Sequence, residues 1–388
     1  MKGPTTVFPP TLEAIAARLS ALDVARYGRT RNALSGAVTG LSPYITHGLI
    51  DPPAVVSAVQ ARTALSAQDK FLLQLGWREF FAHVWRHEGE RILRDLRPAV
   101  SARPYAQVLP EDVLQARTGV PVIDQAVQQL YTSGYLHNHA RLWLASYVVH
   151  LRKVHWRMGA DWLYGHLLDG DLASNHLSWQ WVAGTFSVKP YLFNAENVAR
   201  YAPPDWHSPG TVIDTTYEQL DQWARDADDC GPEALQPPGL STPELLAAPP
   251  AGLRDALSID DISTLPAAIQ LIHPWSLGEI AAPGYRLGVI HAPFHLRFPW
   301  SARRWAFVMD RLRACTDAVW MGELPVLLRA LRDRKLRARA TQNPGYAEAL
   351  HSGAVQLTPV PRVFEEPARC CRSFSQFFAQ QTPGRWHQ

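Results

Sequence analysis

The sequence predicts a mainly α-helical domain followed by a smaller, Rossmann-like α/β domain. From residue 10 to about residue 200, apolar residues recur mostly at three- and four-residue spacing, as in helices that bury one face. A stretch rich in Pro, Gly and Ala follows. Beyond it, short apolar runs alternate with helical patterns, which is typical of α/β units.

Chain length and these changes of pattern set the predicted domain boundaries. A chain of 388 residues with 47% hydrophobic content is long enough for two cores, since domains usually contain about 100 to 200 residues. We expect the helical domain at 1–230, a linker at 231–254 and the small α/β domain at 255–388. The linker contains few large apolar side chains, which is why the boundary is placed there.

The predicted strands of the second domain lie at 285–290 (YRLGVI), 318–321 (AVWM) and 354–360 (AVQLTPV). Helical patterns at about 301–315 and 324–339 separate them. Strands that alternate with helices favour a parallel sheet. The segment HAPFHLRFPW follows a predicted strand, where parallel sheets often bind ligands, but we expect its His291, His295 and aromatic residues to pack against the first domain.

Composition limits the classes of function. A net charge of +3 and a pI near 8.7 permit contact with nucleic acid without indicating it. The four cysteines include no CxxC pair, so we expect free thiols and no metal site. No run approaches 18 apolar residues and the N-terminus lacks a signal pattern, which predicts a cytoplasmic protein without membrane contact. We also expect a monomer.

The densest functional signal lies between residues 118 and 181. Asn138 and Arg141 are three apart, so on a helix both side chains can address one ligand. Asp171 and Asn175 are four apart, which places a carboxylate and an amide on one helix face, and Asp169 is then free to pair with Arg141. Taken singly, the DGD triplet is more typical of a helix-capping turn, and the Asn–Arg pair is more typical of a surface hydrogen bond.

The order TGxPxxD, HNxxR, DGDLAxN and WQW resembles the flavin-binding core of the DNA photolyase and cryptochrome family. The resemblance implies a helical FAD-binding domain with FAD as the cofactor. It places Asn138 and Arg141 at the flavin and Asp169 as the carboxylate that pairs with the arginine. It also places Asp171 beside the isoalloxazine and Asn175 near the flavin N5.

The segment VTGLSPYITHG at 38–48 resembles the phosphate cradle of the same family. Ser42 is a favourable N-cap and Pro43 suits the first helical position, so free backbone amides can face a pyrophosphate. Tyr27 and Arg31 are weaker candidates for the same site. The predicted cradle residues are Thr39, Gly40, Leu41 and Ser42.

A third block, DKFLLQLGWREFFAHV, places Gln74, Trp77, Arg78 and Phe81 on one helix face that can line a cavity. By resemblance, Trp77 packs on a flipped pyrimidine dimer, Trp181 faces it across the pocket, and Arg78 contacts the cofactor. Such stacking contributes about 1 to 3 kcal/mol per base.

Gln74 departs from the pattern of the dimer-repairing members, which have a glutamate three residues before this Trp. An amide can donate a hydrogen bond to a thymine carbonyl but cannot supply a proton. Asn138 is the fourth residue expected at the reaction site, and Leu142, four residues later, replaces a substrate-facing methionine.

The resemblance also assigns Trp179 and Trp156 to a chain of tryptophans that carries electrons to photoexcited flavin. The outer member of that chain falls at Arg103, which has no indole. Either Tyr105 or another Trp such as Trp143 completes the path, or photoreduction is inefficient.

Two functions follow from the resemblance. The first is a photolyase-like flavoprotein in which blue light drives electron transfer from reduced FAD to a pyrimidine photoproduct in DNA, so that UV-damaged DNA is the expected partner. The alternative is a cryptochrome-like blue-light photoreceptor without repair activity. The family usually carries its α/β domain before the flavin domain, whereas this chain has the α/β segment after it.

Overall fold

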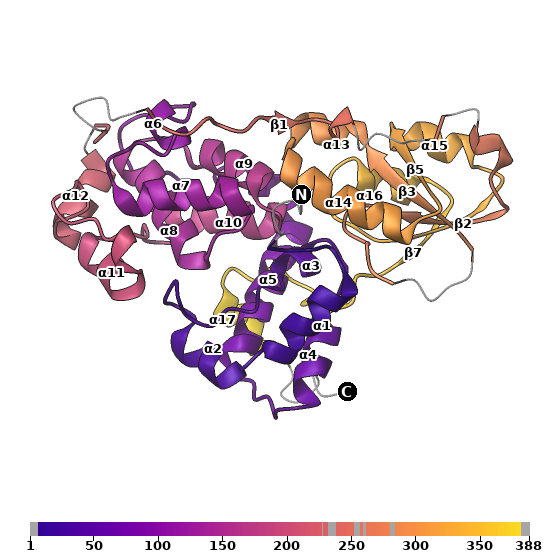
Figure 1. Ribbon diagram of the computed structural model, residues 1–388, viewed down its shortest axis with the longest axis horizontal. Coiled ribbons are helices and arrows are strands. Elements are labelled where there is room, and N and C mark those ends of the chain that lie inside the picture. Colours follow the sequence, from indigo (N-terminus) through magenta and orange to yellow (C-terminus); the bar gives the residue numbers. More distant parts are fainter. Residues whose placement is uncertain are drawn as a thin grey trace, which may run out of the picture.

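The computed structural model describes residues 7–226, 228–231, 238–251, 257–258, 261–279 and 284–381, so part of the predicted linker lies outside the described residues. The helical and α/β units follow each other as predicted (Figure 1). The α-helices of the first unit are α1 (Leu12–Ala21), α2 (Val24–Thr30), α3 (Ser42–Thr46), α4 (Pro52–Gln60), α5 (Lys70–Glu88), α6 (Glu111–Leu114), α7 (Pro121–Ser133), α8 (Asn138–Ser146), α9 (Trp156–His166), α10 (Leu172–Ala183), α11 (Ala195–Tyr201) and α12 (Tyr217–Asp226).

The α/β unit contains a parallel five-stranded sheet in the order β5-β3-β2-β6-β7. Its strands are β2 (Ala268–Ile272), β3 (Tyr285–His291), β5 (Ala318–Gly322), β6 (Lys335–Arg339) and β7 (Val355–Thr358), and its helices are α13 (Ala292–Arg297), α14 (Ala302–Cys315), α15 (Leu324–Ala330) and α16 (Tyr346–Ser352). The prediction of parallel strands alternating with helices is confirmed.

The prediction of one helix over 324–339 is wrong. The chain forms α15 and then β6, in which Leu336 and Ala338 are buried while Lys335 and Arg337 are exposed. This alternation is the period of a half-buried strand. The dense basic side chains favoured a solvated helix in the sequence and concealed the strand.

Part of the predicted linker is a structural element. Strand β1 (Leu245–Leu246) pairs antiparallel with β4 (Trp300–Ser301), and the Trp305 Nε1 donates a hydrogen bond to the Leu246 carbonyl O at 2.9 Å. The Leu245 side chain occupies the space beside Gly165 of α9, since a Cβ at Gly165 would lie 2.7 Å from Leu245 Cδ1. The segment therefore packs between the two units (Figure 1).

The two units share a core. One buried apolar cluster extends from the N-terminal helices through α5 into the sheet. The rings of Tyr44 and Phe307 lie 5.9 Å apart across this boundary, and those of Tyr164 and Phe298 also 5.9 Å. His295, expected to contact the helical unit, lies instead inside the α/β unit, 4.4 Å from the Trp300 ring.

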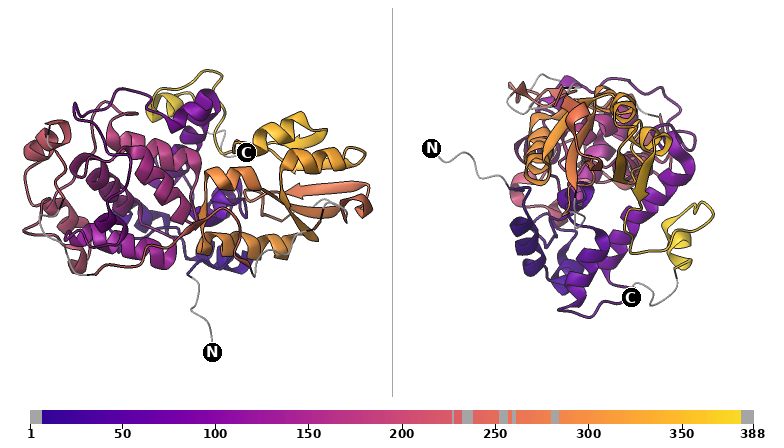
Figure 2. Two further views of the ribbon diagram at one scale, coloured as in Figure 1. Left: turned by 90° about the horizontal axis from the view of Figure 1, so that it is seen from above. Right: turned by 90° about the vertical axis from the view of Figure 1, so that its right-hand side faces the viewer.

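The C-terminal segment, residues 361–381, leaves the sheet after β7 and returns to the helical unit. Figures 1 and 2 show its helix α17 (Phe374–Ala379) beside α5, away from the sheet. Buried Glu79 of α5 accepts hydrogen bonds from the backbone N–H groups of Val363 and Phe364, at 2.8 and 3.0 Å. By its contacts this segment belongs to the helical unit, and not to the α/β unit as the predicted range 255–388 has it.

We expect Glu79→Ala to loosen the C-terminal segment, because it leaves one buried and one part-buried backbone N–H group without their acceptor. A typical intramolecular hydrogen bond contributes about 0.5–1.5 kcal/mol net, so the loss of two should lower the free energy of unfolding by about 1–3 kcal/mol. Urea denaturation measures the loss, and limited trypsin digestion after Arg369 and Arg372 measures the loosening. The control is Glu218→Ala at an exposed position of α12. Protease resistance equal to that of the control contradicts the prediction.

Candidate functional site

The helical unit encloses a cavity of about 280 Å³ between α5, α8, α10 and the α2–α3 region. Segments that are far apart in the sequence meet around it, and most of the predicted site residues lie in its wall. Those that line it are Tyr27, Thr39, Leu41, Ser42, Gln74, Trp77, Arg78, Asn138, Arg141, Asp169, Asp171, Asn175 and Trp179. Gly40, Trp156 and Trp181 are not among the lining residues.

The central ion pair of the cavity joins Arg141 of α8 to Asp169, as predicted. The Arg141 Nη2 donates to both carboxylate oxygens, at 2.9 and 2.8 Å, and the Asp169 side chain is only 4% exposed. Burial alone would raise the pKa of Asp169, but Arg141 outweighs it and holds that pKa below its ordinary value. Asp169 is therefore ionised at neutral pH.

Asp171 and Asn175 stand at the start of α10. Asp171 caps this helix by accepting a hydrogen bond from the Ser174 N–H at 2.8 Å, and its other oxygen lies 3.8 Å from Arg78 Nη2. The Asp171 side chain thus both caps α10 and lines the cavity. The Asn175 Nδ2 donates to the Ala160 carbonyl O at 2.8 Å, which leaves the side-chain oxygen as the atom for a ligand.

The helix of the predicted phosphate cradle begins one residue earlier than expected. Helix α3 starts at Ser42, with Leu41 at the cap position, so the assignment of Ser42 as N-cap is wrong. Gly40 adopts φ +59°, and a Cβ there would lie 2.6 Å from Arg18 Nη1. Only glycine suits that position, and it turns the chain so that its neighbours Thr39 and Leu41 reach the cavity.

The aromatic pair expected across the pocket is arranged differently from the prediction. The Trp77 ring lines the cavity, but Phe374 of α17 stacks on it with a centroid distance of 4.4 Å and an interplanar angle of 14°. The Trp181 ring lies outside the cavity wall, 5.5 Å from the Tyr191 ring. Its neighbour Trp179 lines the cavity instead, because the two side chains leave α10 in different directions.

The predicted electron-transfer residues lie on adjoining helices. The Trp179 ring packs directly over Gly159, one turn of α9 beyond Trp156. Buried Trp156 donates its Nε1–H to Asp95 Oδ1 at 2.5 Å. Of the two alternatives for the outer member, Tyr105 is linked to Trp156 through the His155 ring, which both rings contact.

Trp143, the other alternative, is fully buried and stacks near Phe193 at a centroid distance of 6.2 Å. Arg103, at the position of the missing outer indole, is exposed and donates to the Asp226 carbonyl O.

Sequence reasoning missed several cavity residues. His137, His139, Tyr135 and Ser174 line the cavity, and each lies within three positions of a residue that was singled out. Among the described residues, the buried Ser174 Oγ and His139 Nδ1 have no hydrogen-bond partner, which fits a ligand with polar edges. Burial raises the pKa of Tyr27 to about 12 and lowers that of His137 to about 4, so both are neutral at pH 7.

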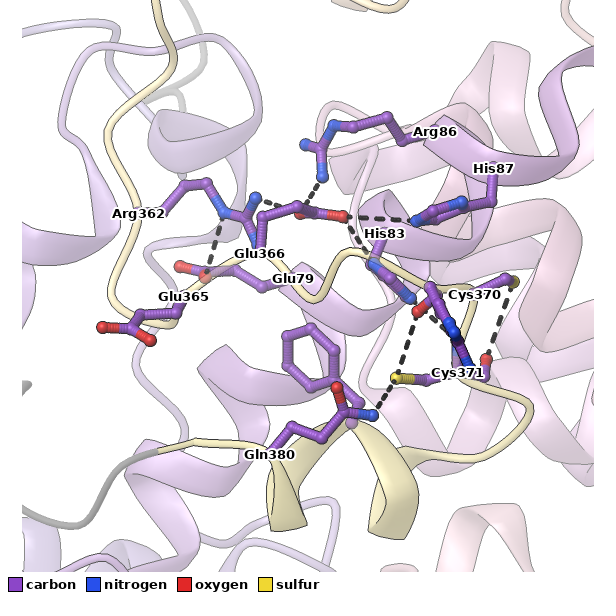
Figure 3. Close-up of polar contacts among 12 residues, drawn as sticks. Glu79, His83, Arg86, His87, Arg362, Glu365, Glu366, Cys370, Cys371 and Gln380 are labelled. Atoms are coloured by element: carbon purple, nitrogen blue, oxygen red, sulfur yellow. Dashed lines mark hydrogen bonds and ion pairs between the residues drawn. The ribbon is translucent and has the colours of Figure 1, made fainter.

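A group of possible metal ligands, His83, His87 and Glu366, lies on the opposite side of α5 (Figure 3). The Cys371 N–H donates to His83 Nε2 at 2.9 Å, so the proton of this neutral imidazole is on Nδ1. Nδ1 in turn donates to Glu366 at 2.5 Å and has no lone pair for a metal. Arg86 also pairs with Glu366, so the group serves to fasten the C-terminal segment.

Comparison with known proteins also indicates a flavin cofactor. A family model described as the FAD binding domain of DNA photolyase matches residues 71–208. Residues 71–208 thus match the FAD-binding domain of the photolyase and cryptochrome family. FAD is the cofactor of this type of domain, and the charged and orphaned polar groups of the cavity fit its ring edges.

The chain is 34% identical over 167 residues to a deoxyribodipyrimidine photo-lyase of Streptomyces griseus, which covers 42% of this chain and 36% of the relative. It is 29% identical over 240 residues to a chloroplastic/mitochondrial cryptochrome DASH of Ostreococcus tauri, covering 58% and 43%. The chain thus spans less than half the length of these relatives. The crystal structure of a Synechocystis sp. cryptochrome has a TM-score of 0.47 at 21% identity and covers 59% of this chain and 56% of its own.

Among the described residues, no helix is both long and apolar enough to cross a membrane. The cysteines Cys230, Cys315, Cys370 and Cys371 are free thiols, as expected.

We expect Gly159→Ala to displace the Trp179 ring, because the added Cβ would lie 2.2 Å from its Cη2 atom. Overpacking of this kind costs about 1–3 kcal/mol. Thermal unfolding measures the loss. The control is Gly28→Ala in α2, where nothing lies within 4 Å and the better helix propensity of Ala should stabilise by about 0.5–1 kcal/mol. Equal effects of the two substitutions contradict the prediction.

Proposed function

We propose that the protein is a photolyase-like flavoprotein in which blue light drives electron transfer from reduced FAD to a pyrimidine photoproduct in DNA. The observation that carries the proposal is the meeting of Arg141, Asp169, Asp171, Asn175 and Trp77 on one cavity. When bound, reduced FAD supplies the photoexcited electron, and the protein supplies binding, orientation and electrostatics.

The cavity residues take distinct roles in this proposal. The Arg141–Asp169 pair and Asp171 address the polar edge of the isoalloxazine, and the Asn175 oxygen accepts a hydrogen bond near N5. Thr39, Leu41 and Ser42 stand where the resemblance puts the pyrophosphate, and Tyr27 adds a neutral hydroxyl. Arg78 lies close enough to Asp171 to balance its charge.

Trp77, whose ring lines the cavity, is the proposed platform for a base flipped out of the duplex. A photoproduct is already poorly stacked, so its extrusion costs less than that of an intact base. One face of Trp77 carries Phe374, so a base can stack only on the other face unless α17 moves. Gln74, one helical turn from Trp77, can donate a hydrogen bond to the base carbonyl, and Asn138 lies at the exposed edge of the same cavity.

A repair assay tests the proposal. Pre-reduced protein and a UV-irradiated oligonucleotide are illuminated with blue light, and reversal of the photoproduct is followed by chromatography, with a dark sample as control. We expect light-dependent reversal by the native protein and an increase of about tenfold in Gln74→Glu, since a positioned acid typically contributes about 10²–10⁴-fold. The proposal is lost if neither protein reverses any photoproduct in the light.

The second candidate function is a blue-light photoreceptor without repair activity. Two observations favour it: the amide of Gln74 in place of an acid, and the C-terminal segment that covers part of Trp77. In this case Trp179, Trp156 and Tyr105 bring electrons to the cofactor, and the change in charge there alters a surface that a partner recognises.

Photoreduction without DNA tests the electron path that this function requires. Under blue light with an external reductant, we expect Trp179→Phe to slow the loss of the oxidised flavin absorbance at least about tenfold, because phenylalanine is far harder to oxidise than an indole. Trp206→Phe is the matched control, since Trp206 is a buried indole of the same unit that does not line the cavity. Equal rates in the two variants would show that Trp179 does not carry the electron.

A further inference from the structure

Three consecutive backbone carbonyls of the Leu168–Gly170 segment accept hydrogen bonds from side chains distant in the sequence. The Leu168 O faces His47 Nε2 at 2.9 Å, and the Asp169 O accepts from the Thr46 hydroxyl at 3.3 Å. The Gly170 O accepts from Arg304 Nη2 at 2.6 Å. Because Asp169 and Asp171 flank Gly170, these bonds fix the backbone that carries both cavity carboxylates.

Arg304 is the only one of these three side chains that comes from the α/β unit. It lies on α14, is 0% exposed, and its Nη1 donates to the Tyr164 carbonyl O at 2.7 Å. The guanidinium lies 4.1 Å from the Trp300 ring and 4.6 Å from the Tyr164 ring. Within the described part of the chain, no carboxylate lies within ion-pair distance of it.

A buried cation without a contacting counter-ion is costly, so its presence calls for a compensating role. Burial lowers the pKa of Arg304, while the nearby Tyr164, Asp169 and Asp171 oppose that shift. A guanidinium stays protonated under these conditions. The positive charge of Arg304 therefore lies at the backbone of the Leu168–Gly170 segment. The carboxylates of Asp169 and Asp171 line the cavity.

The absence of a side chain at Gly170 leaves room for the Arg304 guanidinium. A Cβ at Gly170 would lie 2.4 Å from Arg304 Nη1 and 2.5 Å from the Tyr164 carbonyl O, so any larger residue would push the guanidinium out. The fork of Arg304 reaches two carbonyls with two separate nitrogens, which the single ammonium of a lysine cannot reproduce. The glycine between the two aspartates is thus explained by an arginine more than 130 residues away.

We infer that Arg304 is a positioning residue of the flavin site, through which the C-terminal α/β unit fixes the placement and the charge balance of Asp169 and Asp171. The inference rests on the proposed contact of these carboxylates with FAD. It makes the α/β unit a structural requirement of the cofactor site and not a separate appendage.

Two substitutions separate geometry from charge. Arg304→Lys keeps the charge and loses the fork, whereas Arg304→Met loses both at similar volume. We expect both to raise the dissociation constant for FAD at least about tenfold, measured by titrating the apoprotein in the dark and following flavin fluorescence. Only Arg304→Met should shift the midpoint potential of the bound flavin to more negative values, because only it removes positive charge near the ring.

The matched control is Arg311→Met. Arg311 lies two turns further along α14, is also buried, and donates to the Leu277 carbonyl O at 2.9 Å without touching the Leu168–Gly170 segment. It should leave FAD affinity and potential unchanged while costing similar stability. If the Arg304 variants match this control in both measurements, Arg304 only packs the interface and the inference is overturned.

Should Arg304→Met fail to fold, Thr46→Val decides the matter, because it removes the bond to the Asp169 O at nearly constant volume. We expect a weaker loss of FAD affinity, about threefold, and native affinity would overturn the inference. These readouts need neither light nor DNA. A protein that binds FAD as expected but repairs no photoproduct refutes the proposed function alone.

Discussion

Two carboxylates separated by one glycine have to be held in fixed positions in the wall of a largely buried cavity. Like charges so close together destabilise each other unless cations are near, and here three arginines from three elements supply them. Arg141 holds Asp169 directly, Arg78 faces Asp171, and Arg304 stands behind the backbone between them. The placement of α5, α8 and α14 around this short segment follows from that requirement.

This constraint also accounts for the close union of the two units. An α/β domain after the flavin domain would be free to move if it met the helices only through polar side chains, as many domain interfaces do. Here the apolar core is continuous across the boundary, and strand β1 closes the same junction from the other side. The two units therefore share one core, and the cavity lies in the helical unit.

The C-terminal segment acts on the opposite face of α5. Glu79 and His83 bind its backbone, Glu366 is held by the surrounding histidine and arginines, and Phe374 reaches Trp77 as a result. A single helix thus presents Gln74, Trp77 and Arg78 to the cavity and an acidic and histidine-bearing face to the segment that covers it. Whatever binds at Trp77 meets a ring that already has one stacked neighbour.

The sequence by itself determined the helical fold, the α/β character of the second unit and about half of the residues that line the cavity, among them its arginines and aspartates. These depend on local spacing: apolar periodicity sets the helices, and the three- and four-residue intervals put Asn138 near Arg141 and Asp171 near Asn175. It could not determine that Trp179 and not Trp181 enters the cavity, that β6 is a strand, or that Phe374 covers Trp77. Those outcomes, and the role of Arg304, depend on contacts between segments more than a hundred residues apart or on which face of an element is buried, and only the packing of the whole chain decides them.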